Sequence, residues 1–218
     1  MVLSQTDFEK GEKCFAQKQF SKAQTLFESD LKAHPNKIKT LEYLGDIQSM
    51  AKNWNLAVDY YMTVKTLNPK SADFQYKYGG ALAMLAKDSN KLKAITMIDD
   101  IESSFLKAIQ YDPKHIDARW ALVELYLQLP AIIGGSETKA NRYANELLKL
   151  SAVDGYLAKG HMEEFFKRYT EAEKQYKVAI EIGNSKMTYQ KLADLYKYKL
   201  NQPEKANVIM AEFSKNKS

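Results

Sequence analysis

The feature that most limits what this chain can fold into is a step of 34 residues that recurs along its first half. Residues of the same kind stand one step apart at four places: Gly11 and Gly45, Ala23 and Ala57, Phe27 and Tyr61, and Pro35 and Pro69. Each copy therefore has a small residue, an alanine twelve residues later, an aromatic residue four after that and a proline eight further on. A fixed period of this length is typical of proteins built from stacked copies of one structural unit.

The later copies keep this pattern with two interruptions. Gly79 continues the glycine series, but the aromatic and proline positions of the third copy come ten residues late. The fourth copy has Val123 at the glycine position, and its second half comes five residues late. The last two copies return to register. We therefore predict one domain over residues 4–215, made of six repeats at about 4–37, 38–71, 72–115, 116–152, 153–186 and 187–215.

Within each repeat the apolar residues recur at helical spacing, as in Leu41, Leu44 and Ile47. A proline disfavours the helical conformation of the residue before it, so the first three repeats, which end in Pro35, Pro69 and Pro113, each end in a turn. This pattern predicts two helices per repeat, near 4–17/20–33, 38–51/54–67, 71–87/91–111, 115–129/136–150, 153–167/169–182 and 186–199/202–215. The ten extra residues should lengthen the second helix of repeat three. One helix pair cannot bury its apolar stripe alone, so the pairs should stack into an all-α, right-handed α-solenoid.

The spacing of glycine, alanine, aromatic residue and proline resembles that of the tetratricopeptide repeat (TPR) family. The stretch "GGSETKA", residues 134–140, is similar to a turn in stand-alone bacterial TPR proteins. The resemblance implies a non-catalytic scaffold for protein–protein interaction. It also implies that the first helices of the repeats line a concave groove, with five positions of each first helix facing it.

Carrying these positions over gives the candidate partner-binding residues. They are Phe8, Glu12, Phe15, Glu42, Asp46, Asp73, Tyr76, Asp117, Trp120, Glu124, Leu127, Leu157, His161, Glu164 and Phe165. Acidic residues outnumber basic ones at the groove positions, although the whole chain has a net charge of +5. The groove is therefore predicted to bind a basic, partly apolar protein or peptide, with Trp120 as the main anchor.

The sequence contains little that indicates catalysis. It has no phosphate-binding loop motif and no H-E-x-x-H motif, and its one cysteine, Cys14, excludes a cysteine-rich zinc site. His161 and Glu164 stand one helical turn apart, but two ligands do not make a metal site. We therefore expect no enzyme activity, no cofactor and no metal.

The glycine pair at 134 and 135 allows two interpretations. One is a lengthened turn that ends at Ser136, the N-cap of the next helix, with Gly135 as the candidate for a positive φ. The other is an anion site at the helix start, helped by Lys139. We favour the structural interpretation because Glu137 already places negative charge there.

An alternative function is binding of a small molecule or metabolite, in the groove or at the 134–136 turn. A buried pocket closed by the long helix of repeat three would favour it. The apolar residues of 91–111 also allow a homodimer through that helix. Lysines interspersed with acids do not favour nucleic-acid binding, and no apolar run is long enough to span a membrane. The chain is expected to be cytoplasmic, or periplasmic if "MVLSQ" is the remnant of an export signal.

Overall fold

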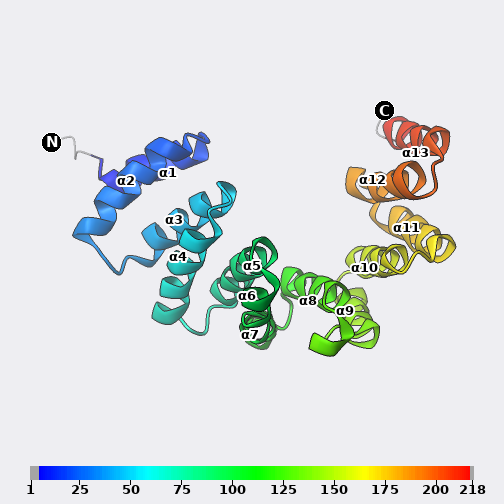
Figure 1. Ribbon diagram of the computed structural model, residues 1–218. Helices are drawn as coiled ribbons and strands as arrows, with labels where there is room; N and C mark the ends of the chain where they lie inside the picture. Colours follow the sequence, from blue (N-terminus) through cyan, green and yellow to red (C-terminus); the bar gives the residue numbers. More distant parts are fainter. Residues whose placement is uncertain (1–4, 217–218) are drawn as a thin grey trace. The chain divides into compact units, whose positions relative to one another are not determined.

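The computed structural model describes residues 5–216, and no strand occurs among them. The all-α prediction is confirmed (Figure 1). The helices are α1 (Asp7–Ala16), α2 (Phe20–Ala33), α3 (Ile38–Met50), α4 (Trp54–Leu67), α5 (Ala72–Asp88), α6 (Lys91–Ile95), α7 (Ile98–Tyr111), α8 (Ile116–Gln128), α9 (Glu137–Leu150), α10 (Ala152–Phe165), α11 (Tyr169–Gly183), α12 (Lys186–Asp194) and α13 (Pro203–Lys215). Residues 1–4, which make up most of the candidate export-signal remnant "MVLSQ", lie outside the described residues.

The chain divides between Pro113 and Lys114 into two compact units, here called the N-terminal unit and the C-terminal unit. Each unit is a short α-solenoid of three helix pairs. The pairs are α1/α2, α3/α4 and α5/α7 in the N-terminal unit, and α8/α9, α10/α11 and α12/α13 in the C-terminal unit. That the whole chain acts as a single domain stays a prediction.

The repeated glycines allow the two helices of a pair to approach closely. A Cβ atom added at Gly45 would lie 2.5 Å from the Tyr61 ring, and one at Gly160 would lie 2.4 Å from the Tyr176 ring. A Cβ atom added at Gly11 would likewise lie 2.7 Å from the Phe27 ring. In these three repeats the aromatic residue therefore packs directly on the helix backbone at the glycine, which explains why the sequence repeats both residues together.

Repeat three differs from the prediction. The single helix expected over 91–111 is broken at Thr96 and Met97, between the five-residue α6 and the 14-residue α7. The extra residues build α6 instead, while α5 has the 17 residues expected for the first helix of this repeat. The reason is packing: Ile98 and Ile101 are buried, so α7 takes the place of an ordinary second helix, while Ile95 stays 46% exposed.

The first helix of repeat six also departs from the prediction. A continuous helix was expected over 186–199, but α12 ends at Asp194 and a π-helical turn follows, Leu195–Lys199. In this turn the Leu200 amide donates to the Leu195 carbonyl at 3.1 Å. The wider turn keeps Leu195 and Tyr196 buried at the end of the helix.

The glycine pair after α8 follows a short 3₁₀ turn, Ala131–Ile133. The positive φ belongs to Gly134, at 103°, and not to Gly135. Gly135 is needed for a different reason, because a Cβ atom there would lie 1.8 Å from the Leu129 carbonyl oxygen. Ser136 is the predicted N-cap: its Oγ accepts from the Lys139 amide at 3.2 Å. Both glycines thus have a structural role in the turn.

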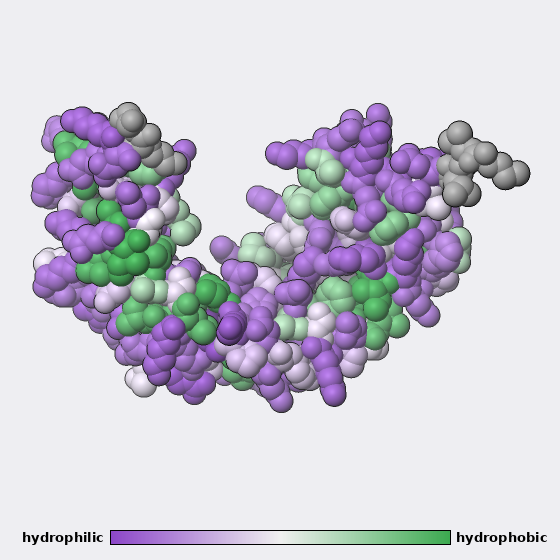
Figure 2. All heavy atoms as spheres, turned by 180° about the vertical axis from the view of Figure 1, so that it is seen from behind, coloured by the Kyte–Doolittle hydropathy of each residue, from purple (hydrophilic) through white to green (hydrophobic). Residues whose placement is uncertain are grey.

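Polar side chains cover most of the face seen in Figure 2, and apolar side chains form smaller patches among them. The core lies between the helices, where the repeated alanines Ala23 and Ala57 and their counterparts Ala140 and Ala172 in later repeats are fully buried. In the part of the chain that the structure describes, no helix is long and apolar enough to cross a membrane.

Candidate functional site

In each unit the predicted partner-binding residues lie on the first helices of the pairs. We call this side the first-helix face: α1, α3 and α5 in the N-terminal unit, and α8, α10 and α12 in the C-terminal unit. The two faces are described separately.

The acids of α3 in the N-terminal unit bind a lysine of the same chain. The Lys77 ammonium of α5 donates to Glu42 Oε1 at 2.8 Å and to both carboxylate oxygens of Asp46, at 2.7 and 3.0 Å. Lys39 donates to the other Glu42 oxygen at 2.9 Å, and the Tyr61 hydroxyl donates to Asp46 at 2.7 Å. Lysines of the same chain therefore largely neutralise the negative charge predicted for this part of the face.

The role of Lys77 as the partner of these acids was not predicted, because Lys77 is not one of the positions carried over from the TPR family. A signal did exist. Lys77 stands 35 residues after Glu42 and 31 after Asp46, about one repeat, which brings its helix beside theirs.

The contacts favour the charged forms of Glu42 and Lys77. Burial alone would raise the pKa of the Glu42 carboxyl, but hydrogen bonds from Lys77 and Lys39 hold that pKa below its usual range. Burial would likewise lower the pKa of Lys77, but hydrogen bonds to Asp46 and Glu42 raise it above its usual value. The cluster is a set of paired, partly buried charges.

Replacing Glu42 with glutamine should destabilise the protein at neutral pH more than at acid pH. Because the pKa of Glu42 is lower in the folded state, its contribution is present above the ordinary value of 4.5 and is lost as the pH falls through the folded pKa. The melting temperatures of wild type and Glu42→Gln should therefore differ near pH 7 and converge toward about pH 3. Glu181→Gln, at an exposed residue of α11, is the control. A constant Tm difference for Glu42→Gln would contradict this account.

The predicted residues of α1 are part of a packed cluster. The Phe8 ring lies 5.9 Å from that of Phe27, and the Phe15 ring lies 4.9 Å from that of Tyr43, measured between centroids. Glu12 accepts a hydrogen bond from the Tyr43 hydroxyl at 3.1 Å. These three residues join α1 to its neighbours while remaining partly accessible.

Two candidates lie on α5. The Tyr76 ring packs 6.0 Å from that of Phe105, between centroids, and is half-buried. Asp73 is exposed in the first turn of the helix, where a negative charge is favourable.

In the C-terminal unit, Trp120 is held in place by its neighbours. Its indole Nε1 donates to Asp154 Oδ1 at 2.9 Å, and the Ser151 hydroxyl donates to the other carboxylate oxygen at 2.6 Å. The ring is half-buried against the core of this unit. The tryptophan is therefore fixed in orientation before any partner arrives.

His161 pairs with a carboxylate of another helix and not with Glu164, one turn away on its own helix. Its Nε2 lies 2.8 Å from Glu124 Oε2 of α8, whereas Glu164 accepts from the Tyr176 hydroxyl at 2.9 Å. Glu164 also lies 3.6 Å from the Lys199 ammonium. Glu124 nevertheless keeps a side chain that is 50% exposed.

The remaining candidates of this unit divide into exposed and buried residues. Asp117 is exposed, and Phe165 is 40% exposed, with its ring edge-on to Phe166. Leu127 and Leu157 were wrongly predicted to face a partner: they are only 5% and 3% exposed and belong to the core. Both side chains lie between helices, where burial of a leucine stabilises the fold.

Comparison with known proteins agrees with this architecture. A family model described as "Plant specific mitochondrial import receptor subunit TOM20" matches residues 61–154, less than half of the chain. A thermophilic TPR protein in Thermus thermophilus is similar at 18% identity and a TM-score of 0.64, over 94% of this chain and 97% of that one. A TPR protein from Parabacteroides merdae gives 16% identity and a TM-score of 0.69, over 94% and 77% of the two chains.

The chain has the TPR fold. YrrB, described as "a TPR protein with an unusual peptide-binding site", is a further similar structure, at 12% identity and a TM-score of 0.59 over 84% of this chain and 87% of that one. The resemblance predicted from glycine, alanine, aromatic residue and proline is therefore confirmed at the level of the fold. None of the proteins named here is described as an enzyme.

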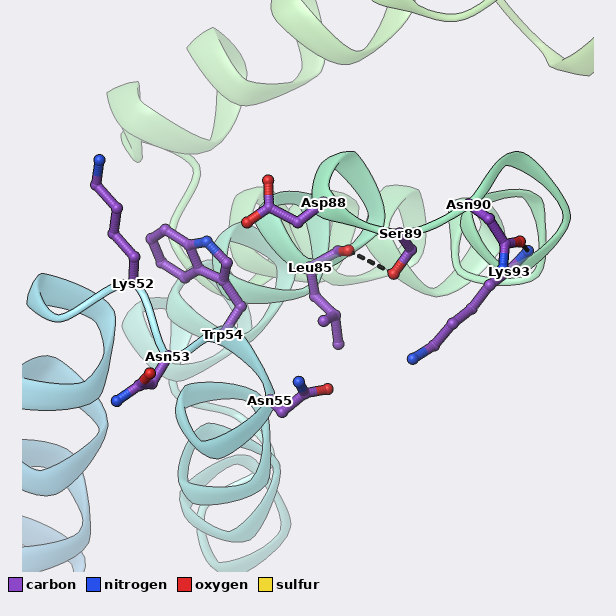
Figure 3. Close-up of a pocket in the computed structure, with 9 residues that line it drawn as sticks. All are labelled: Lys52, Asn53, Trp54, Asn55, Leu85, Asp88, Ser89, Asn90 and Lys93. Atoms are coloured by element: carbon purple, nitrogen blue, oxygen red, sulfur yellow. Dashed lines mark hydrogen bonds between the residues drawn. The ribbon is translucent and has the colours of Figure 1, made fainter.

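Among the surface hollows of the described residues, two are of ligand size and open to solvent. One, of about 430 Å³, lies in the N-terminal unit (Figure 3), and one of about 390 Å³ is lined by α12. A buried pocket closed by the long helix of repeat three would have favoured the small-molecule alternative, but the break between α6 and α7 removes that helix. Within residues 5–216, no three His, Cys, Asp or Glu side chains gather as a metal site.

Proposed function

We propose that the protein is a non-catalytic interaction scaffold that binds a basic, partly apolar peptide segment on the first-helix face of its C-terminal unit. The observation that carries this proposal is the combination of an oriented indole, Trp120, with the exposed Glu124 carboxylate and the exposed Phe165 ring. Tryptophan dominates binding energy at many interfaces, and exposed carboxylates attract a basic partner and set its register.

A contact within the N-terminal unit illustrates how acidic groove positions can bind a basic side chain. There the family's groove positions Glu42 and Asp46 hold an ammonium group, that of Lys77, with the Tyr61 ring centroid 5.8 Å from it. A lysine side chain of a partner would find similar groups around Trp120. The peptide-binding site in the description of YrrB and the import receptor in that of the matching family fit a scaffold that binds peptides.

A homodimer through residues 91–111 remains part of this proposal. Since Ile98, Ile101 and Phe105 are buried within the chain, the apolar side chains that α6 offers to a second copy are Leu92 and Ile95, which are 80% and 46% exposed.

The charge preference can be tested with two designed peptides that share a leucine and a phenylalanine and differ only in carrying four lysines or four glutamates. The lysine peptide should bind the wild type, and its association should slow as salt screens the attraction. Glu124→Lys should slow association about tenfold or more at low salt and flatten the salt dependence, because it reverses the charge at the site. Stopped-flow or surface-based kinetics at two salt concentrations give both quantities.

Glu181→Lys supplies the matched control, because it makes the same charge change at an exposed residue of α11. It should leave the association rate almost unchanged. Preferential binding of the glutamate peptide, or equal effects of both substitutions, would contradict the proposed function.

A further inference from the structure

The hollow in Figure 3 lies where the turn between α3 and α4 meets the turn between α5 and α6. It is lined by Lys52, Asn53, Trp54, Asn55, Leu85, Asp88, Ser89, Asn90 and Lys93. Five of these nine come from the end of α5, the turn after it and α6, the segment that repeat three has gained. The hollow is therefore a product of the departure from the regular repeat, and it is separate from the first-helix positions discussed above.

Several polar groups around the hollow have no partner among the described residues. The Trp54 indole N–H has no acceptor there, and the Lys52 and Lys93 ammonium groups have no carboxylate within ion-pair distance. Figure 3 shows Leu85 between Trp54 on one side and Lys93 on the other. The lining is mainly polar, and Trp54 and Leu85 are its two apolar side chains. A few apolar groups beside unpaired donors can hold a ligand that offers both an apolar group and acceptors.

The charges and the apolar groups indicate the kind of ligand. Lys52 and Lys93 outweigh the single acid, Asp88, so the hollow favours carboxylates. Trp54 and Leu85 provide a surface for one apolar side chain, and the neighbouring Leu92 of α6 is 80% exposed. Tryptophan is one of the residue types most enriched among the side chains that contribute most to binding energy at interfaces.

We infer that this hollow is a second peptide-docking site, which takes an apolar side chain flanked by acidic residues. Its preference in charge is the opposite of that proposed for the first-helix face of the C-terminal unit. The protein would then hold two different segments, one acidic and one basic, at separate places.

The chain has only two tryptophans, so Trp120→Phe leaves Trp54 as the single fluorescent reporter at the hollow. The probe is an acetylated, amidated five-residue peptide with a central leucine between glutamates. Its titration should give a saturable change in Trp54 emission, weakened at higher salt. The counterpart with lysines in place of the glutamates should give no change.

Two substitutions at the hollow should act in opposite directions. Lys93→Ala should weaken binding of the acidic peptide about fivefold, and Asp88→Asn should tighten it, because they remove an attractive and a repulsive charge. Lys70→Ala, at an exposed lysine of the same unit, is the control and should have no effect. The inference is overturned if the acidic peptide gives no emission change, if both peptides bind equally, or if Lys93→Ala and Asp88→Asn act alike. A change in emission with protein concentration alone would assign the hollow to a second copy and also overturn it.

Discussion

Replacing Gly155 with alanine should lower the melting temperature by roughly 4–8 °C, a large loss of stability for so small a change. A Cβ atom at this position of α10 would lie 2.3 Å from the Leu148 Cα, 2.5 Å from its Cβ and 2.5 Å from its amide nitrogen. These are mostly backbone atoms of α9, which cannot rotate away as a side chain can. The two helices must move apart, and overpacking of this kind costs about 1–3 kcal/mol or more.

A matched control is available in the N-terminal unit. Gly80 also lies inside a helix, but a Cβ atom there would meet nothing within 4 Å. Both substitutions improve helix propensity by up to about 1 kcal/mol, so Gly80→Ala should leave the melting temperature unchanged or raise it. Thermal unfolding followed by circular dichroism compares the two. A rise in both variants would contradict the close approach of α10 to α9.

The comparison of sequence and structure separates two kinds of glycine. Gly45 and Gly160 were predictable, because each recurs at a fixed distance from the aromatic residue that packs on it. Gly155 was not predictable in this way. Its requirement comes from the preceding helix of another repeat, a contact that has no counterpart in the 34-residue period.

The break between α6 and α7 was missed for a related reason. Ile95, Ile98 and Ile101 stand three residues apart, so their spacing continues across the break as in one helix. Periodicity says which residues share a face, but not whether α7 can keep its normal place on α5. Burial of Ile98 and Ile101 keeps α7 in its normal place on α5, and the preceding residues therefore form the separate helix α6.

The candidate site was predictable in part. The family pattern placed Glu124 and Phe165 on an accessible face, but it also selected the buried Leu127 and Leu157. It did not show that Lys77 neutralises the acids of α3. Which side chains pair between repeats depends on side-chain length and direction, and these are not properties of a position in a repeat.

The second large effect is expected at Trp120. Its removal should weaken binding of the lysine-containing peptide by about 2 kcal/mol or more, roughly 30-fold, as at the centre of other interfaces. Part of this loss would come from Asp154, which loses the hydrogen bond from the indole Nε1. Trp120→Phe keeps an aromatic ring without that donor and should fall between wild type and Trp120→Ala.

The most direct test of the proposed binding face is therefore the dissociation constant of the lysine-containing peptide for wild type, Trp120→Phe and Trp120→Ala. It is measured by calorimetry on variants whose circular dichroism shows that they are folded. We predict a graded loss that reaches about 30-fold in Trp120→Ala. An unchanged dissociation constant in a folded Trp120→Ala protein would contradict the account.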